Sequence, residues 1–392
     1  MPLSGIRVLD LTRIISGPFC SVLLADMGAE VIKIESPGEG DPVRRQGVVR
    51  DGLSWYFANY NRNKRSVTLD LYSPQGKQVL AELVRSCDVV VENFRPGIME
   101  KLGLGPEPLR ALRPDIVHCA INGFGATGPY RDRPAFDFVA QAMSGFMSLN
   151  GEADGPPLRA GPPVSDLVAG LHGALGIVAA LLRRERTGQG ESLNVSLLSS
   201  MINLLSFQAS NYFASGELPP RHGNDHGIVA PYGLFETADG QVAIAPSNDM
   251  MYARLLQALD MPELADHPDY RTNALRMRNR LALREVVQAR TRTQSTDYWI
   301  ERCNRHGVPC GPVLDVRQVF DDPQVRDQQM AIDVPHPGHG EVRMLGFPIK
   351  FEQAPCRVRH PAPELGADTD AVLSEIGIGA ARLAQLRQEG VI

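Results

Sequence analysis

The 392-residue sequence has no surplus of basic residues, few aromatic residues and only six cysteines. Its 40 lysines and arginines are outnumbered by 45 aspartates and glutamates, which gives a formal charge of −5. Proteins that bind nucleic acid through phosphate contacts normally carry a basic surplus, so we expect no nucleic-acid partner. The cysteines are scattered along a long chain, which is typical of reduced thiols in a cytoplasmic protein and not of a disulfide framework.

Long apolar runs are also missing. Residues 1–19 contain no apolar run of the length that a signal sequence needs. The most apolar later stretch, Leu167–Leu182, falls short of the roughly 20 residues of a membrane-spanning helix and is interrupted by His172 and by glycines. We therefore expect a buried core helix there, in a soluble, cytoplasmic protein with no membrane partner. Because 43% of the residues are hydrophobic, the chain can build a sizeable core, which excludes a disordered protein.

The pattern that is present in residues 1–125 alternates between the period of a strand and the period of a helix. Strands are expected at residues 6–11, 29–35, 66–71, 88–91 and 115–121, with helices at 16–27 and 74–86. Strands that alternate with helices, and that are apolar enough to be buried on both faces, predict a parallel sheet covered by helices. We therefore expect an α/β fold with a Rossmann-like parallel sheet in a large domain.

From about residue 220 the pattern changes. Asp239-Gly240 lies between two short alternating segments, at residues 232–236 and 241–246, and Asp-Gly in this position predicts a β-hairpin. Helices are expected at residues 248–260, 278–292 and 296–306, a further strand pair at 341–345 and 349–351, and a last helix near 379–389. Residues 220–325 are therefore interpreted as a second, smaller α+β domain.

Two motifs have the spacing of cofactor or metal sites, but their context argues against both. Gly123–Gly128 matches the G-x-G-x-x-G of dinucleotide-binding loops, yet Pro129 and Pro134 follow where a helix would have to begin. We expect a glycine loop that lines some other ligand. Cys303–Cys310 contains two thiols and an imidazole, but a structural zinc site needs four ligands and no second pair is nearby. No metal site is expected.

Two short segments are candidates for phosphate contacts. Asn61–Arg65 carries a cluster of cations before an expected strand, and it is either a solvated turn or a surface that meets phosphates. Asn93–Gly97 follows a buried strand, at the edge where open α/β sheets bind their ligands. Arg95 in this segment, with Lys101 after it, could hold a phosphate through charge-assisted hydrogen bonds; a capped turn with a solvated arginine is the alternative.

Asp166 is the acidic residue with the most suggestive position, because it starts the most apolar helix expected in the chain. A structural interpretation makes it the N-cap of that helix, where the helix dipole stabilises a carboxylate. A catalytic interpretation makes it a nucleophile that stays ionised at the mouth of an apolar helix. The residues alone leave both interpretations open.

Taken together, these segments resemble CoA-transferase family III, a group that includes formyl-CoA transferase, the carnitine and bile-acid CoA-transferases and the related α-methylacyl-CoA racemases. The resemblance runs from about residue 3 to beyond residue 350. It is carried, in order, by residues 8–35, 61–70, 88–97, 122–130, 136–147 and 161–170. It implies an interlocked homodimer whose large CoA-binding domain starts with residues 1–200 and is completed by residues 326–392, with the smaller domain at 220–325.

The resemblance also implies roles for single residues. The family's catalytic aspartate corresponds to Asp166, whose carboxylate would attack an acyl-CoA thioester and pass through anhydride and aspartyl-CoA intermediates. Asp137 matches an acidic or polar position of the active site and is expected to contact the substrate. The positions expected to contact CoA are Ile14, Ile15, Ser16, Leu69, Asn93, Phe94, Arg95 and Lys101. Some members place an arginine that meets the CoA phosphates where this chain has Ser36. The candidates to replace it are Arg44, Arg45 and the cations of Arg62–Arg65.

The activity implied is a CoA-transferase with an acyl-CoA and a carboxylic acid as substrates. No cofactor is expected beyond the CoA thioester, which is a co-substrate, because each step exchanges one activated acyl bond for another. A racemase of the same family would need an acid/base pair around the substrate carbon, and Phe136 stands where racemases place a histidine. His118 and His172 lie elsewhere and are expected to be core residues. A CoA-binding protein without activity is the third interpretation, in which Asp166 is only a cap.

The segment Arg221–Tyr232, together with Tyr270–Asn273 and Arg276–Arg280, resembles the succinyl-CoA-dependent dicarboxylate transferases. This implies succinyl-CoA or a similar donor and a short dicarboxylate as acceptor. A second carboxylate needs a cationic or amide partner, because burying it unpaired costs several kcal/mol. The residues expected to supply this partner are Arg221, His222, Asn224 and His226.

Overall fold

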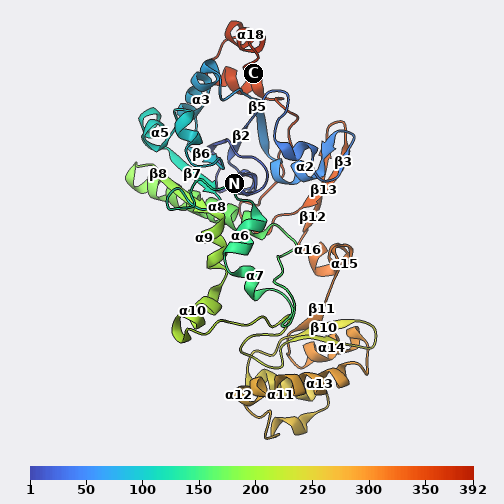
Figure 1. The fold of residues 1–392 in the computed structure, drawn as a ribbon. Coiled ribbons are helices and arrows are strands. Elements are labelled where there is room, and N and C mark those ends of the chain that lie inside the picture. The colour runs from blue at the N-terminus through green and yellow to red at the C-terminus, as the bar shows by residue number, and fades with distance from the viewer. The chain divides into compact units, whose positions relative to one another are not determined.

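The structure, a computed structural model, describes residues Met1–Ile392 and divides into two compact units (Figure 1). The larger unit consists of Met1–Phe146, Arg159–Phe213 and Gln324–Ile392. The smaller unit consists of Met147–Leu158 and Ala214–Pro323, so it includes a short segment that lies well before residue 220 in the sequence. The chain therefore leaves the larger unit and returns to it.

The larger unit is built on a six-stranded parallel sheet with the order β5-β2-β1-β6-β7-β8. Its strands are β1 (Arg7–Asp10), β2 (Glu30–Glu35), β5 (Lys64–Thr68), β6 (Val89–Glu92), β7 (Val117–Asn122) and β8 (Glu191–Ser196). The strand order reverses between β1 and β6, and open sheets of this kind bind ligands beside that reversal, at the carboxyl ends of the strands. The predicted α/β fold with a parallel sheet is confirmed.

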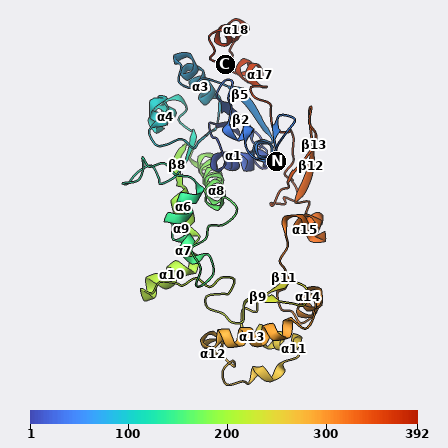
Figure 2. The ribbon, with the colours of Figure 1, turned by 45° about the vertical axis from the view of Figure 1, so that its right-hand side comes forward.

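Helices cover both faces of this sheet, which is why its central strands are apolar on both sides. One face packs against α3 (Pro74–Ser86), α5 (Pro106–Leu112), α17 (Thr369–Glu375) and α18 (Ala380–Gln388). The other face packs against α1 (Ser16–Asp26), α6 (Asp137–Met143), α8 (Val164–Thr187) and α9 (Leu197–Asn203). Figure 2 shows α17 next to β5, where Asp368 and Ser66 exchange hydrogen bonds of 2.9 and 3.0 Å. The C-terminal segment thus covers the edge of the sheet.

Helix α8 has 24 residues and is the one helix whose length and composition would suffice to cross a membrane. The core helix of a soluble protein can have the same length and composition. One side of α8 packs on the sheet, where Ile177 and Ala169 are fully buried. On the opposite side, Leu175 and Leu182 are 68% and 53% exposed. The expected core helix is therefore buried on the side that faces the sheet, whereas its opposite side is exposed in the single chain.

The smaller unit contains a three-stranded antiparallel sheet of β9 (Gly233–Glu236), β10 (Gln241–Ile244) and β11 (Cys310–Pro312). The expected hairpin across Asp239-Gly240 is present as β9 and β10. The sheet packs against α11 (Asp249–Ala258), α13 (Arg280–Thr291) and α14 (Thr296–Arg305) around the fully buried Trp299. Cys303 is a buried free thiol within this core, and Cys310 is a partly buried free thiol that packs against it.

The other helices are short. They are α2 (Trp55–Asn61), α4 (Ile98–Lys101), α7 (Phe146–Leu149), α10 (Ser206–Ser215), α12 (Asn273–Arg278), α15 (Val316–Asp321) and α16 (Pro323–Asp327). Two hairpins complete the chain, β3 (Val49–Arg50) with β4 (Leu53–Ser54) and β12 (Ala331–His336) with β13 (Gly340–Leu345). The partner of β13 is therefore not at residues 349–351, because the Pro337-Gly338 turn brings β12 alongside it first.

Candidate active site

The amino ends of α1 and α8 lie close together because glycines of α8 leave room for α1. A Cβ atom at Gly170 would lie 2.7 Å from the backbone oxygen of Ser16, and one at Gly173 would lie 3.1 Å from Sγ of Cys20. Larger side chains at these positions would push the helices apart. The first turns of the two helices, which carry Ser16 and Asp166, therefore meet.

Asp166 is not the N-cap of α8. The helix begins at Val164 with Pro163 as its N-cap, so Asp166 is the third residue of the first turn. The side chain is half-buried. Its removal from water, together with the nearby Asp137 carboxylate, raises the pKa of Asp166 to about 7, and a hydrogen bond from Ser16 acts in the opposite direction. A carboxyl group whose pKa is raised in this way is typical of functional sites.

Asp137 holds the first turn of α8 in place. Its Oδ1 accepts hydrogen bonds from the backbone nitrogen and the hydroxyl of Ser165, both at 2.9 Å. Its Oδ2 accepts a hydrogen bond of 2.7 Å from Nε2 of Gln141. Because both oxygens are engaged within the chain, the geometry favours a positioning role for Asp137 over the direct substrate contact that the resemblance implied.

Two tyrosines of α2, which the sequence analysis did not single out, lie near Asp166. Burial raises the pKa values of Tyr56 and Tyr60, and the Asp166 charge adds to the increase for both. Their rings pack edge to face with centroids 5.6 Å apart, and Tyr60 also contacts Phe19 of α1. Both phenols stay protonated and can donate hydrogen bonds. Their spacing of four residues on a helix indicates packing as readily as function, so the sequence gives no distinct signal.

The loop between β1 and α1 is held by buried charges. Lys33 donates to the backbone oxygen of Thr12 at 2.8 Å and to Oδ2 of Asp41 at 2.9 Å. Oδ1 of Asp41 in turn accepts a hydrogen bond of 3.2 Å from the backbone nitrogen of Ile14. Ile14 has a φ of +72°, which a β-branched residue rarely adopts, and these contacts maintain that strained conformation.

Asn93, the residue directly after β6, holds the same loop in place. Its Oδ1 accepts from the backbone nitrogen of Arg13 at 2.9 Å, and its Nδ2 donates to the backbone oxygen of Arg13 at 2.8 Å. Nδ2 also lies 3.5 Å from Oγ of Ser16. The structure thus brings Asn93 together with the expected loop residues Ile14, Ile15 and Ser16.

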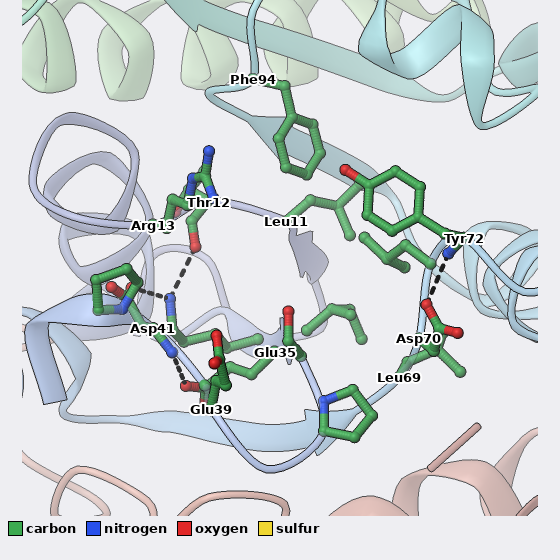
Figure 3. Close-up of a pocket in the computed structure, with 17 residues that line it drawn as sticks. Leu11, Thr12, Arg13, Glu35, Glu39, Asp41, Leu69, Asp70, Tyr72 and Phe94 are labelled. Carbon is green, nitrogen blue, oxygen red and sulfur yellow. Dashed lines mark hydrogen bonds and ion pairs between the residues drawn. The ribbon is translucent and has the colours of Figure 1, made fainter. Parts of the chain in front are cut away.

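A cavity of about 190 Å³ lies at the carboxyl ends of β1, β2 and β5. Figure 3 shows the rings of Phe94 and Tyr72 close to Leu11, with Leu69 beside Asp70 and Arg13 on the opposite side. Two of the expected CoA-contacting residues, Leu69 and Phe94, therefore line one cavity. The sequence analysis did not include Tyr72, which is 72% exposed, because a single exposed aromatic residue carries no pattern.

Arg13 is the cation of this cavity that no carboxylate neutralises. Its side chain is exposed and lines the cavity beside Ser36. Arg44 is not available to replace the arginine missing at Ser36, because it binds both oxygens of Glu35 at 2.7 and 2.8 Å. Arg45 is exposed and does not line the cavity. The sequence signal for Arg13 is its place in the loop that directly follows a buried strand.

The basic segment Asn61–Arg65 is neither a solvated turn nor a phosphate surface. Arg62 and Lys64 are 5% and 1% exposed. Arg62 pairs with Asp26 at 2.7 Å, and Lys64 pairs with Asp10 at 3.0 Å. Both expectations are wrong because buried carboxylates, distant in sequence, neutralise these cations. The strand also begins at Lys64, two residues before the expected start.

Arg95 and Lys101 do not line the cavity that contains Arg13, whereas Phe94 lines both that cavity and the one that contains Arg95. Arg95 lines a second cavity of about 310 Å³, at the carboxyl ends of β6 and β7, together with Glu92 and His118. Burial lowers the pKa of His118 to about 4 and raises the pKa of Glu92 to about 8. Lys101, at the end of α4, is exposed and lines neither cavity. The loop after Gly123 continues to Phe136 without a helix, as expected.

The residues expected to bind a distal carboxylate, Arg221, His222, Asn224 and His226, belong to the smaller unit, whereas Asp166 belongs to the larger one. The Arg221 guanidinium donates to the backbone oxygens of Glu152 and Gly155 at 3.2 and 2.5 Å, so it fastens segment 147–158.

The other members of this loop have different partners. Nδ1 of His222 lies 2.9 Å from Nη1 of Arg280, and the His226 ring contacts the Tyr232 ring with centroids 4.9 Å apart. Asn224 is exposed. Arg280 forms no ion pair, and it lines a small hollow together with His226 and with Asp225, whose carboxylate pairs with Arg284. It is therefore a better candidate than Arg221 for a free cation.

These features define an α/β protein with a ligand cavity beside the reversal of strand order and a carboxyl group of raised pKa near it. A family model described as CoA-transferase family III matches residues 3–369. The chain is 38% identical over 376 residues to succinyl-CoA:glutarate CoA-transferase from Homo sapiens, covering 96% of this chain and 86% of the relative. It is 40% identical over 388 residues to succinyl-CoA:mesaconate CoA-transferase from Haloarcula hispanica, covering 96% and 97%.

The solved structures agree. A CAIB/BAIF family protein from Brucella suis matches with a TM-score of 0.84 and 38% identity, covering 96% of this chain and 99% of that one. The chain therefore belongs to CoA-transferase family III. The prediction of a CoA-transferase is confirmed.

Proposed function

We propose that this enzyme moves CoA from succinyl-CoA to a short dicarboxylate, with Asp166 as the nucleophile. The observation that carries the proposal is the position of Asp166 where the first turns of α1 and α8 meet, next to Ser16. Three residues before Ser16, Arg13 lines the cavity that also contains Phe94 and Tyr72. The loop that contains Arg13 and Ser16 therefore contacts the proposed nucleophile at one end and lines the cavity at the other. The cavity suits a planar ring and an anionic group.

The proposed reaction has four steps. An Asp166 oxygen attacks the carbonyl carbon of the donor thioester, the C–S bond breaks, and CoA thiolate leaves a mixed anhydride. The thiolate attacks the aspartyl carbonyl and releases the donor carboxylate, which leaves an aspartyl-CoA thioester. The acceptor carboxylate then attacks this thioester, forming a second anhydride and releasing thiolate again. The thiolate finally attacks the acyl carbonyl of the acceptor, which frees the new acyl-CoA and the Asp166 carboxylate.

Each addition places negative charge on a carbonyl oxygen, and several groups of this site can stabilise it. The first backbone N–H groups of α1 have no intrahelical acceptor, and no side chain caps this helix end. The phenol groups of Tyr56 and Tyr60 and the hydroxyl of Ser16 are further donors near Asp166. Donors fixed in advance in this way commonly contribute the largest share of the rate enhancement. The route needs no cofactor besides the CoA ester.

Chemical trapping tests the nucleophile. The enzyme is incubated with succinyl-CoA alone and then treated with hydroxylamine or borohydride, and its peptides are analysed by mass spectrometry. We expect a hydroxamate or a reduced residue at Asp166 and unmodified Asp137 in the same digest. A modification at another residue, or none while the enzyme turns over, would refute the assignment. The Asp166→Asn variant is the matched control and should give no adduct.

The substrate class rests on the two relatives named above and on the cations of the smaller unit. Arg280 forms no ion pair and lies against His222, so within the smaller unit it is the cation best placed to bind a carboxylate. A donor–acceptor panel should show succinyl-CoA with C4–C6 dicarboxylates ahead of acetyl-CoA with butyrate or oxalate. The reverse order would contradict the dicarboxylate proposal without affecting the role of Asp166.

Variants of the same region refine this test. Arg280→Ala should raise KM for the dicarboxylate about tenfold, a typical value for a lost charge-assisted hydrogen bond, and leave KM for the acyl-CoA unchanged. Arg278→Ala, which removes an exposed arginine from the end of α12, serves as the control. Equal losses with mono- and dicarboxylates would show that Arg280 only shapes the loop.

We also propose a homodimer with interlocked chains in the cytoplasm. The support for the dimer is a group of exposed apolar side chains on three helices of the larger unit, an exposure that typically marks a contact surface. It consists of Phe136, Phe138, Val139 and Met143 around α6, Leu171, Leu175, Val178 and Leu182 on α8, and Phe207, Tyr212 and Phe213 on α10. A second chain that covers this surface would bury the exposed side of α8.

A further inference from the structure

The hairpin of β12 and β13, which the reaction does not use, carries two histidines at the ends of one tight turn. His336 and His339 are the first and last residues of this turn, and the backbone nitrogen of His339 donates to the backbone oxygen of His336 at 3.0 Å. Pro337 and Gly338 fill the middle positions, and Gly338 has a φ of +78°. Proline followed by glycine with positive φ defines a type II turn, which holds its end residues close together.

His336 is a buried imidazole without any hydrogen-bond partner. Its side chain is 4% exposed, and neither Nδ1 nor Nε2 has a partner; Nδ1 of His339 is unpartnered as well. Buried polar atoms are almost always hydrogen-bonded, and each exception needs an explanation. The His336 and His339 rings lie edge to face with centroids 5.1 Å apart, so the two imidazoles face a common space.

Glu364 brings a carboxylate to the same place from a distant part of the chain. One oxygen lies 3.4 Å from Nε2 of His339. The segment before it is fixed, because Ala362 is buried among residues of the hairpin and the backbone oxygen of Pro363 accepts a hydrogen bond of 3.1 Å from Arg44. One ligand atom from each of His336, His339 and Glu364 can be chosen so that all lie within 4.8 Å of one another.

We propose that His336, His339 and Glu364 form a site for one divalent transition-metal ion, with zinc as the expected ion. Two imidazole nitrogens and one carboxylate oxygen are a recurrent zinc donor set, and a water molecule completes the tetrahedron. Ligand atoms about 2 Å from a tetrahedral ion are roughly 3.3 Å apart. The 3.4 Å between His339 and Glu364 already matches this value, and the remaining ligand atom lies within 4.8 Å of both, so it has to approach by at most about 1.5 Å.

The ion would have a structural role and would take no part in acyl transfer. It would join the hairpin to the segment that carries Glu364, and so to the edge of the sheet, where Gly366 donates a 2.9 Å hydrogen bond to Ser66. A neighbouring cavity of about 340 Å³ is lined by His336, Glu364 and His360, which leaves an entry path for the ion. The cation Arg65 at this cavity is neutralised by Glu30, Asp368 and Glu375, so it does not repel a metal.

Cobalt binding to the full-length enzyme tests the proposal. Protein stripped by a chelator is titrated with Co²⁺, and the visible d–d absorption is followed. We expect one Co²⁺ per chain, bands of tetrahedral intensity, and no thiolate-to-cobalt charge-transfer band, because no cysteine belongs to the site. Zn²⁺ should displace the Co²⁺ stoichiometrically and should raise the Tm of the wild-type protein.

The variants His339→Ala and Glu364→Gln should each weaken Co²⁺ binding at least about tenfold and abolish the zinc-dependent rise in Tm. The Glu364 side chain is 66% exposed, so Glu364→Gln should fold normally and retain transferase activity. His306→Ala, next to the cysteines of the smaller unit, is the control and should bind metal like the wild type. A charge-transfer band, or unchanged affinity in both site variants, would overturn the proposal.

Discussion

At the scale of single residues, opposing effects act on the pKa of Asp166. The dipole of α8 favours the carboxylate, whereas removal from water and the Asp137 charge favour the protonated acid and raise the pKa to about 7. A nucleophile must be ionised, so the free enzyme should lose activity on the acid side. We expect kcat/KM to rise with pH up to a plateau above about 7, and a flat profile between pH 5 and 8 would contradict this.

The same raised pKa has a consequence for stability. Between the ordinary aspartate value of 3.8 and about 7, the folded chain binds a proton that the unfolded chain has lost, so the stability falls as the pH rises. Asp166→Asn removes the charge. We expect this variant to be inactive and yet more stable than the wild type at pH 8, by on the order of 2–4 kcal/mol in urea unfolding.

The stability gain of Asp166→Asn should shrink as the pH is lowered and vanish near pH 4. Ser16→Ala is a useful companion, because it removes the hydrogen bond that favours the carboxylate and should move the kinetic pKa further upward. If Asp166→Asn were equally destabilised at both pH values, Asp166 would be a structural residue and not a strained nucleophile.

Arg13 offers a test of the cavity next to Phe94. If it holds a phosphate of CoA, Arg13→Ala should raise KM for the acyl-CoA about tenfold with little change in kcat. Arg45→Ala removes a nearby exposed arginine that does not line the cavity and serves as the control. Initial rates at varied acyl-CoA and fixed acceptor distinguish the two variants. Similar KM values for both would exclude Arg13 as the phosphate contact.

At the scale of elements, the contact between α1 and α8 sets the geometry of the site. A methyl group at Gly170 would meet the backbone oxygen of Ser16 at 2.7 Å, so Gly170→Ala must move one helix. We expect a loss of stability of about 1–3 kcal/mol and a fall in kcat of roughly tenfold or more. The control is Gly311→Ala, whose added Cβ meets nothing within 4 Å. Normal kcat in Gly170→Ala would show that the catalytic groups tolerate this displacement.

The elements themselves were largely predictable, because hydrophobic periodicity reports burial directly. The helix at Pro74–Ser86 was predicted with its observed bounds, since Ser73 caps it and proline opens it. Contacts distant in sequence were not predictable. The segment Asn61–Arg65 has the composition of a surface loop, and its burial depends on Asp10 and Asp26, which no local pattern connects to it. The clamp of Asn93 on Arg13 was missed for the same reason. The hairpin partner of β13 was missed although it is local, because the turn signal of Pro337-Gly338 was not used.

The residues that the sequence singled out for the candidate site have different surroundings in the structure. The resemblance pointed to Asp166, Asn93 and Phe94, which the structure places around one loop and its cavity. It also pointed to Arg221, whose guanidinium is engaged by backbone oxygens of a segment nearly 70 residues earlier. A charged side chain is available to bind a substrate only if the fold leaves it without a partner. Its partners depend on tertiary structure, which the local sequence does not reveal.

At the scale of the whole molecule, the exposed apolar side of α8 predicts the oligomeric state. Light scattering at micromolar concentration should give a dimer that does not dissociate on dilution. Replacing Leu175 and Leu182 by glutamate would place charges on the apolar face and should yield aggregates or monomers with little activity. Leu218→Glu, at an 82% exposed position of the smaller unit, is the control. A fully active monomer would refute the dimer.

The discontinuity of the larger unit has a consequence for how the protein is made. Val372, Leu373, Leu386 and Val391 belong to the core on one face of its sheet, so that core stays incomplete until these residues have left the ribosome. The smaller unit, mostly contiguous at 214–323, is synthesised before then and can fold first. The order of folding would thus be the reverse of the order of synthesis. The nascent chain would expose the apolar strands of its first half throughout, which makes it a natural client for chaperones that bind near the exit tunnel.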